Sequence, residues 1–204
     1  MNLYNLIFGF LMSLFIMNSY GAERVLLFIG DSLTEGYGVE KSESYPQLIQ
    51  NKLDQKYGAG KFKVLNGSVS GSTSASGLSR LNWFKKSNPE FLILGLGAND
   101  GLRGVTPQMT KANLKKIINA ALELKIKVLL LGMMMPPNYG PQYTDEFKSI
   151  YPELSKEYDI GFVPFVLAGV AGEKSLNQGD GIHPNSKGHS VISETVWNSL
   201  EKML

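Results

Sequence analysis

Residues 25–38 read Val25-Leu26-Leu27-Phe28-Ile29-Gly30-Asp31-Ser32-Leu33-Thr34-Glu35-Gly36-Tyr37-Gly38, and this stretch decides the fold. Its first five residues form an unbroken apolar run that is too short for a helix and rich in strand formers. Such a run predicts a buried strand of a parallel sheet. The strand is expected to stop at Gly30, and Gly36 and Gly38 favour loop geometry after it. Ser32 therefore lies at the carboxyl end of a buried strand, where open α/β sheets place their functional sites.

The composition is that of an ordinary globular protein. The chain has 204 residues, 20 basic and 18 acidic side chains, a net charge of +2 and no cysteine. This length suits one domain with its own core. The charge balance gives no electrostatic basis for binding nucleic acid, so no nucleic-acid partner is expected. Without cysteine there are no disulfides, no thiolate ligands and no cysteine nucleophile, and two histidines are a poor set of zinc ligands. No cofactor and no metal is expected.

The first residues differ from the rest of the chain. Residues 1–22 carry no charged side chain, and the apolar block Leu6–Met17 is shorter than the roughly 20 residues that a membrane span needs. Ser19 and Gly21 are small residues in the two places that suit cleavage after Gly21. We therefore expect a secretory signal peptide over 1–22, a single domain over 23–204, and a periplasmic or secreted protein with no stable membrane partner. The alternative is an uncleaved anchoring helix, because the start has no Lys or Arg.

Strands and helices are predicted to alternate along the domain. A brief alternation of apolar and polar residues predicts a strand at 61–66, and three further apolar runs predict strands at 90–97, 127–133 and 160–165. Helical spacing of apolar residues predicts helices at about 44–57, 75–86, 110–125, 142–157 and 191–200. Alternation of this kind indicates a parallel sheet with right-handed crossovers and helices on both faces. We expect a three-layer α/β/α sandwich with a flavodoxin-like five-stranded sheet in the order 2-1-3-4-5.

Several polar loops follow the predicted strands and should open on one edge of the sheet. Ser32, Gly71 and Asn99 come after the first three strands, and the loop 179–184 follows the last strand. That loop holds His183 three residues after Asp180, so the carboxylate can accept a hydrogen bond from one ring nitrogen and leave the other as a base. Taken singly, each of these residues also has a structural interpretation. Ser32 fits a helix cap, and Asp180 fits a helix cap that happens to lie beside an ordinary loop histidine.

Other residues have simpler interpretations. The second histidine, His189, lies inside the closing helix and is expected to serve packing or the surface. Two familiar motifs fail, since Thr34 stands where the nucleophile elbow of α/β-hydrolases has its second glycine, and Asp100 stands where the dinucleotide fingerprint has its third. The small residues of 67–77 fit either a flexible loop or a loop that lets backbone approach a substrate. Asp31 and Asp100 are expected to bond loop amides rather than to act as acids.

Four blocks in this order resemble the GDSL, or SGNH, hydrolases. The blocks are Gly30-Asp31-Ser32-Leu33, Gly71 in its small-residue loop, Gly97-Ala98-Asn99-Asp100 and Asp180-Gly181-Ile182-His183-Pro184. Within the family the chain looks most like the branch of acyl-CoA thioesterase I, arylesterase and lysophospholipase. The local matches to that branch are residues 34–38, 101–104 and 137–140. The resemblance runs from about residue 24 to the end of the chain.

The resemblance implies a role for each residue. Ser32 matches the family nucleophile, His183 the general base and Asp180 the acid that orients it. The backbone N–H groups of Ser32 and Gly71 and the side-chain amide of Asn99 match the oxyanion donors. These residue types suit the chemistry, because a serine needs an imidazole to take its proton and a tetrahedral oxyanion needs donors fixed in advance.

The implied activity is hydrolysis of small acyl esters and thioesters through an acyl-enzyme on Ser32. Two alternatives remain at this point. One is a carbohydrate O-deacetylase of the same family, and the other is a non-catalytic binding domain on the same scaffold. The apolar residues near the fourth predicted strand and the loop from Gly101 to Pro107 are candidates for the lining of an acyl channel. A monomer or a weak dimer is expected.

Overall fold

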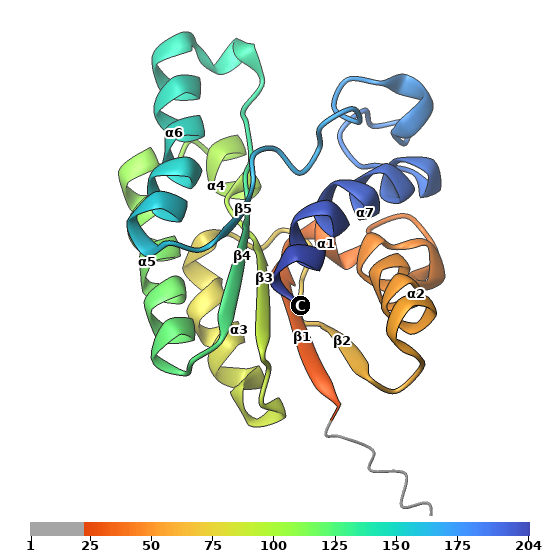
Figure 1. The fold of residues 1–204 in the computed structure, drawn as a ribbon. Helices are drawn as coiled ribbons and strands as arrows, with labels where there is room; N and C mark the ends of the chain where they lie inside the picture. The colour runs from red at the N-terminus through yellow and green to blue at the C-terminus, as the bar shows by residue number, and fades with distance from the viewer. Residues whose placement is uncertain (1–22) are drawn as a thin grey trace, which may run out of the picture.

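The computed structural model describes residues 23–204 as one parallel sheet with helices on both of its faces (Figure 1). The signal peptide predicted for residues 1–22 lies outside the described residues. The strands are β1 Arg24–Gly30, β2 Phe62–Asn66, β3 Phe91–Gly95, β4 Lys127–Leu131 and β5 Gly161–Val163. All neighbouring strands are parallel, and their order is β2-β1-β3-β4-β5. The predicted fold class and strand order are confirmed.

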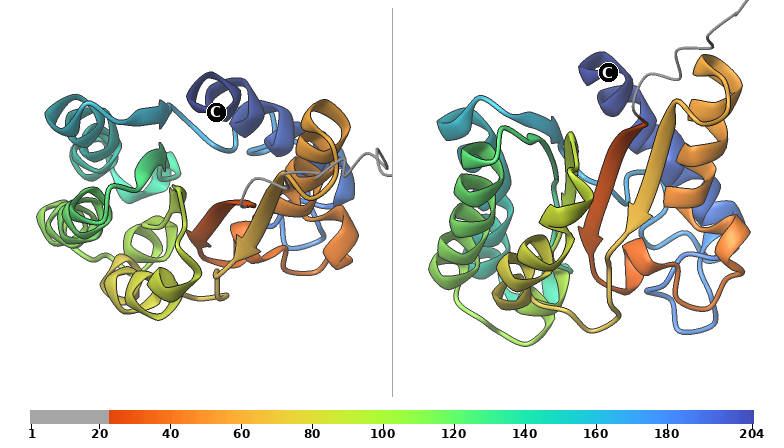
Figure 2. Two further views of the ribbon diagram at one scale, coloured as in Figure 1. Left: turned by 60° about the horizontal axis from the view of Figure 1, so that its bottom comes forward. Right: turned by 90° about the horizontal axis from the view of Figure 1, so that it is seen from below.

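Seven α-helices connect and cover the strands of the described chain. They are α1 Ser32–Glu35, α2 Tyr45–Tyr57, α3 Gly77–Phe84, α4 Ala98–Leu102, α5 Pro107–Glu123, α6 Pro141–Tyr158 and α7 Ser186–Leu200. Helices α2 and α7 pack together on one face of the sheet, and α3, α5 and α6 pack side by side on the other (Figure 2). Within residues 23–204, none of these helices combines the length and the apolar character that a membrane crossing requires.

The centre of the sheet holds the core. Residues 26–29 of β1, 91–94 of β3 and 128–131 of β4 are almost completely inaccessible to solvent. They are apolar throughout because helices cover both sides of these strands, which leaves no solvent-facing side for polar residues. Strand β5 lies at the edge and ends at Val163, shorter than the predicted 160–165, because Pro164 has no N–H to extend the ladder.

Two short helices were not predicted, and both carry predicted site residues. Helix α1 begins at Ser32 and α4 begins one residue before Asn99. Each is about one turn long, so neither shows the repeat from which helices are recognised. Helix α5 also begins earlier than predicted, at Pro107, because Thr106 caps it by accepting a hydrogen bond from the N–H of Met109 at 3.3 Å.

Gly30 is the last residue of β1 and lies two residues before the start of α1. A methyl group at this position would lie 2.6 Å from Cβ of Thr34 and 3.0 Å from the carbonyl oxygen of Gly95. We predict that Gly30→Ala lowers the free energy of unfolding by about 1–3 kcal/mol, because overpacking forces α1 or the neighbouring strand to shift. Urea denaturation measures this. Gly179→Ala is the control, since a methyl group there meets nothing within 4 Å; equal losses in both variants would contradict the prediction.

Candidate active site

Ser32 is held at the carboxyl end of β1 by the cap of its helix. The Asp31 carboxylate accepts a hydrogen bond from the N–H of Leu33 at 3.1 Å and so begins α1. The N–H of Ser32 lies in the first turn, where no preceding helical carbonyl is available to accept it. The buried Tyr45 hydroxyl contacts Oγ1 of Thr34 at 2.9 Å and ties α1 to α2. The serine therefore stands on a short but anchored helix.

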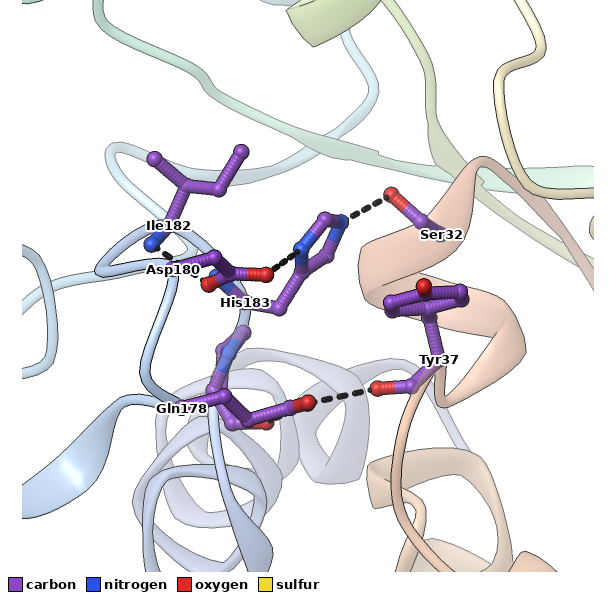
Figure 3. A network of polar contacts seen from close by, with 7 residues as sticks. Ser32, Tyr37, Gln178, Asp180, Ile182 and His183 are labelled. Carbon is purple, nitrogen blue, oxygen red and sulfur yellow. Dashed lines mark hydrogen bonds and ion pairs between the residues drawn. The ribbon is translucent and has the colours of Figure 1, made fainter.

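Three of the predicted residues form one continuous hydrogen-bonded chain (Figure 3). Nδ1 of His183 lies 2.7 Å from a carboxylate oxygen of Asp180, and Nε2 of the same ring lies 3.0 Å from Oγ of Ser32. The ring is mostly buried, whereas the Asp180 carboxylate is partly exposed. The topology thus brings the first and last loops of the domain together, as predicted for a parallel sheet.

The protonation of this chain follows from Asp180. The backbone N–H of His183, its ring and the N–H of Ile182 all donate to the carboxylate, and together they lower the pKa of Asp180 to about 2. An ionised carboxylate only accepts hydrogen bonds, so Nδ1 of His183 carries the proton. In the neutral ring Nε2 is then free to accept the hydroxyl proton of Ser32.

Gln178, which the sequence did not single out, and Tyr37 hold this loop in place. Nε2 of Gln178 donates to the carbonyl of Tyr37 at 2.7 Å and to that of Pro184 at 2.9 Å, which ties the loop of His183 to the segment after α1. The ring of Tyr37 packs against the His183 ring, with 4.7 Å between their centroids. Figure 3 shows both contacts beside Ser32. No local pattern marks Gln178, because its bond to Tyr37 spans 141 positions of sequence.

The two other predicted oxyanion donors lie on neighbouring loops. Gly71 follows β2 in a loop that is tied to the end of β1, since the N–H of Val69 donates to the carbonyl of Gly30 at 3.2 Å. Gly71 has φ +77°, a conformation that favours glycine. Nδ2 of Asn99 lies 3.1 Å from the carbonyl of Ser72. The same nitrogen also donates to a carboxylate oxygen of Asp31, at the longer distance of 3.4 Å. An amide NH₂ has two hydrogens, so one can keep the Ser72 carbonyl while the other exchanges Asp31 for a substrate oxygen.

Comparison with known proteins identifies the family. Residues 28–191 match the GDSL-like lipase/acylhydrolase family. The chain belongs to this family. It is 37% identical over 195 residues to Esterase TesA of Pseudomonas aeruginosa, covering 95% of this chain and 96% of that protein. It is 36% identical over 184 residues to the "Thioesterase 1/protease 1/lysophospholipase L1" of Escherichia coli K12, covering 90% and 86% of the two chains.

A solved structure extends the comparison to the fold. The crystal structure of TesA superposes with a TM-score of 0.84 at 37% sequence identity, over 89% of this chain and all of that one. The sequence resemblance to the branch of thioesterase I and lysophospholipase is therefore confirmed. This GDSL-family protein is a hydrolase of ester bonds.

The buried carboxylates of this GDSL-family hydrolase bond neighbouring amides, as expected from the sequence. Asp31 caps α1, and Asp100 accepts from the N–H of Ser74 at 2.7 Å. Both side chains are almost inaccessible to solvent. Burial raises the pKa of Asp31 to about 6, and the hydrogen bond from Leu33 only partly opposes this.

His189 packs between helices rather than joining the site. It is buried, its ring stacks on Tyr45, and its Nδ1 accepts a hydrogen bond from the N–H of Tyr45 at 3.3 Å. Burial lowers the pKa of His189 to about 4. The ring is therefore neutral at pH 7, and the expected packing role is confirmed by these contacts.

Within the part of the chain that the structure describes, the hydrogen-bonded chain belongs to no metal-binding cluster and does not line the hollow at the start of α6. Among residues 23–204, no cluster of three or more His, Asp or Glu side chains could hold a metal ion. A hollow of about 480 Å³ at the start of α6 is lined by residues 139–143 and Glu146, none of which is a predicted site residue. It adjoins the loop 101–107, because the Tyr143 hydroxyl donates to the carbonyl of Val105 at 2.8 Å.

The raised pKa of Asp31 gives a prediction for stability. Between pH 4 and 6 the folded protein holds more protons on Asp31 than the unfolded chain, whose carboxyl has a pKa of about 3.9. The contribution of Asp31 to the free energy of unfolding therefore falls as the pH rises through this range. In Asp31→Asn this loss is absent, while an oxygen remains to cap α1.

We expect the stability of Asp31→Asn minus that of wild type to increase by about 2 kcal/mol between pH 4 and pH 7. The experiment compares the two proteins because the contribution of His189, which both contain, cancels in their difference. The lowered pKa of His189 makes the free energy of unfolding rise with pH between about 4 and 6.5, opposite to the effect of Asp31. Urea denaturation of both proteins across this range provides the values. A difference that does not change with pH would contradict the assignment of a buried, raised-pKa carboxyl to Asp31.

Proposed function

We propose that this chain is a serine esterase in which Ser32 is the nucleophile, His183 the general base and Asp180 the residue that orients it. The observation that carries the proposal is the continuous path of hydrogen bonds from Asp180 through the His183 ring to Oγ of Ser32. A serine hydroxyl becomes an effective nucleophile when an oriented imidazole takes its proton.

The proposed reaction has two stages. Nε2 of His183 accepts the Ser32 proton as Oγ attacks the acyl carbon, and the same nitrogen then protonates the leaving group. Water, activated by His183, afterwards hydrolyses the acyl-enzyme. In each stage the oxyanion accepts hydrogen bonds from the N–H groups of Ser32 and Gly71 and from Nδ2 of Asn99. Asp180 remains ionised throughout and stabilises the imidazolium that forms.

The proposed substrates are small acyl esters and thioesters with an apolar acyl chain. Four exposed apolar side chains belong to segments that follow strands at the edge of the sheet where Ser32 lies, namely Tyr37, Val69, Leu102 at the end of α4, and Ile182. Such a surface suits a hydrocarbon chain better than a sugar ring, which needs hydrogen-bonding partners. The names of the two relatives, an esterase and a thioesterase with lysophospholipase activity, point the same way.

We also propose a periplasmic or secreted location. Its support is the apolar block Leu6–Met17 followed by Ser19 and Gly21, a pattern typical of a cleaved leader. The N-terminal sequence of protein recovered from the periplasm or the medium tests this. We expect it to start after Gly21, and a retained Met1 on membrane-bound protein would contradict it.

The nucleophile is tested by replacing it. We predict that Ser32→Ala lowers kcat for p-nitrophenyl esters on the order of 10⁶-fold, close to the background rate, while the fold is unchanged. Ser79→Ala is the matched control, because Ser79 is exposed on α3 and its hydroxyl donates to the carbonyl of Ser76, the residue just before that helix. Equal rates for Ser32→Ala and wild type would refute the proposal.

A series of esters with increasing acyl length tests the substrate class. We expect kcat/KM to rise from acetyl to hexanoyl and octanoyl esters, because each added methylene can contact the apolar side chains around Ser32. An acyl thioester should be cleaved as well. Activity on acetyl esters alone, together with release of acetate from an acetylated polysaccharide, would favour the carbohydrate O-deacetylase instead.

A further inference from the structure

The tip of the loop that carries Gly71 has little packing to hold it. Ser70 and Gly71 are both exposed, and a methyl group built on Gly71 would meet only Nη2 of Arg103, at 3.6 Å. The loop is nevertheless ordered into a turn, in which the N–H of Ser72 donates to the carbonyl of Val69 at 3.1 Å. Polar contacts from outside the loop must therefore set its position relative to Ser32.

One such contact comes from the nucleophile helix itself. Glu35 is the last residue of α1, whose first residue is Ser32. One carboxylate oxygen of Glu35 accepts from the backbone N–H of Ser70 at 2.7 Å, and the Ser70 hydroxyl donates to the same oxygen. Hydrogen bonds to an ionised carboxylate are stronger than those between neutral groups. The peptide group just before the one that carries the Gly71 N–H is thus tied to α1.

A second contact comes from the other side. Arg103 directly follows α4, the helix of Asn99, as its C-cap, and its Nη2 donates to the carbonyl of Gly71 at 3.0 Å. The peptide group just after the Gly71 N–H is thus tied to α4. Asn99 adds the contact with the carbonyl of Ser72, one residue further on. The loop is bound on both sides to the helices that carry the two other oxyanion donors.

We propose that Glu35 and Arg103 are positioning residues that fix the Gly71 N–H relative to Ser32 and Asn99. The proposal rests on the proposed role of Gly71 as an oxyanion donor. Neither side chain touches the substrate in this account; each holds a neighbouring peptide group. Because a preorganised donor lowers the barrier only if it is already aimed at the developing charge, loss of either contact should act on kcat.

A positioning role and a purely structural role differ in what they do to the melting temperature and to KM. A structural role would change one or both of them, whereas a positioning role leaves both unchanged. An exposed hydrogen bond contributes little to global stability, so the melting temperature of the variants should stay within about one or two degrees of wild type. Substrate binding should also be unchanged, because the oxyanion exists only after attack by Ser32. A kcat defect at constant KM and constant melting temperature is therefore the signature of positioning.

The experiment compares Glu35→Ala, Glu35→Gln and Arg103→Met in the full protein with a p-nitrophenyl ester. We expect kcat of Glu35→Ala and of Arg103→Met to fall about tenfold, less than the roughly 10²–10³-fold loss caused by removing an oxyanion donor outright. KM should stay within about twofold. Glu35→Gln should recover to within about threefold of wild type, because its amide oxygen still accepts from the Ser70 N–H. The control is Glu123→Ala, an exposed residue at the end of α5, which should match wild type.

The outcomes separate this inference from the proposed function. If Glu35→Ala and Arg103→Met keep wild-type kcat while Ser32→Ala and Asn99→Ala lose it, the positioning role is wrong and the esterase proposal stands. If the Glu35 variants lose melting temperature or raise KM in step with kcat, the contacts are only structural and the inference is again wrong. If Ser32→Ala remains active, the proposed function fails first.

Discussion

The rest of the site depends on the hydrogen bond between Nε2 of His183 and Oγ of Ser32, which joins residues 151 positions apart. It can form only because β1 and the last loop of the domain open on the same edge of a parallel sheet. Gln178 then brings the His183 loop against the segment after α1, and Asp180 sets the tautomer of the ring. The sheet topology, the position of the His183 loop and the protonation state of the ring are therefore all required for the 3.0 Å contact between His183 and Ser32.

The polar groups around this contact fall into two layers with different physical roles. Beneath the surface, Asp31, Asp100 and His189 are buried and hydrogen-bonded, and they fix where α1, α4 and α7 stand. At the surface, the exposed tip of the Gly71 loop has little packing to hold it, and the charged side chains of Glu35 and Arg103 bind it instead. The hydrogen bonds of the buried groups contribute to the stability of the protein and to its dependence on pH. The exposed hydrogen bonds of Glu35 and Arg103 have little effect on the free energy of unfolding, so their effect is expected in the reaction rate.

Much of the fold could be predicted because its central strands are plain apolar runs between helices of clear periodicity. The site residues Ser32, Asn99, Asp180 and His183 were accessible because short motifs carry them. Helices α1 and α4 were missed, since one turn shows no repeat. The start of α5 could have been found from Thr106 and Pro107, a capping residue followed by proline. The contacts of Tyr37, Gln178, Glu35 and Arg103 could not, because each joins loops that only the folded sheet brings together.

The central claim is that Oγ of Ser32 is activated by His183 and becomes acylated, and the site of a covalent adduct tests it most directly. The protein is treated with a fluorophosphonate, which reacts with activated serine hydroxyls, and the modified peptide is identified by tandem mass spectrometry. The account predicts one adduct, on Ser32, that forms at least a hundredfold more slowly in His183→Ala, on the order of the effect of a general base. An adduct on another residue, or equal labelling of the His183 variant, would contradict it.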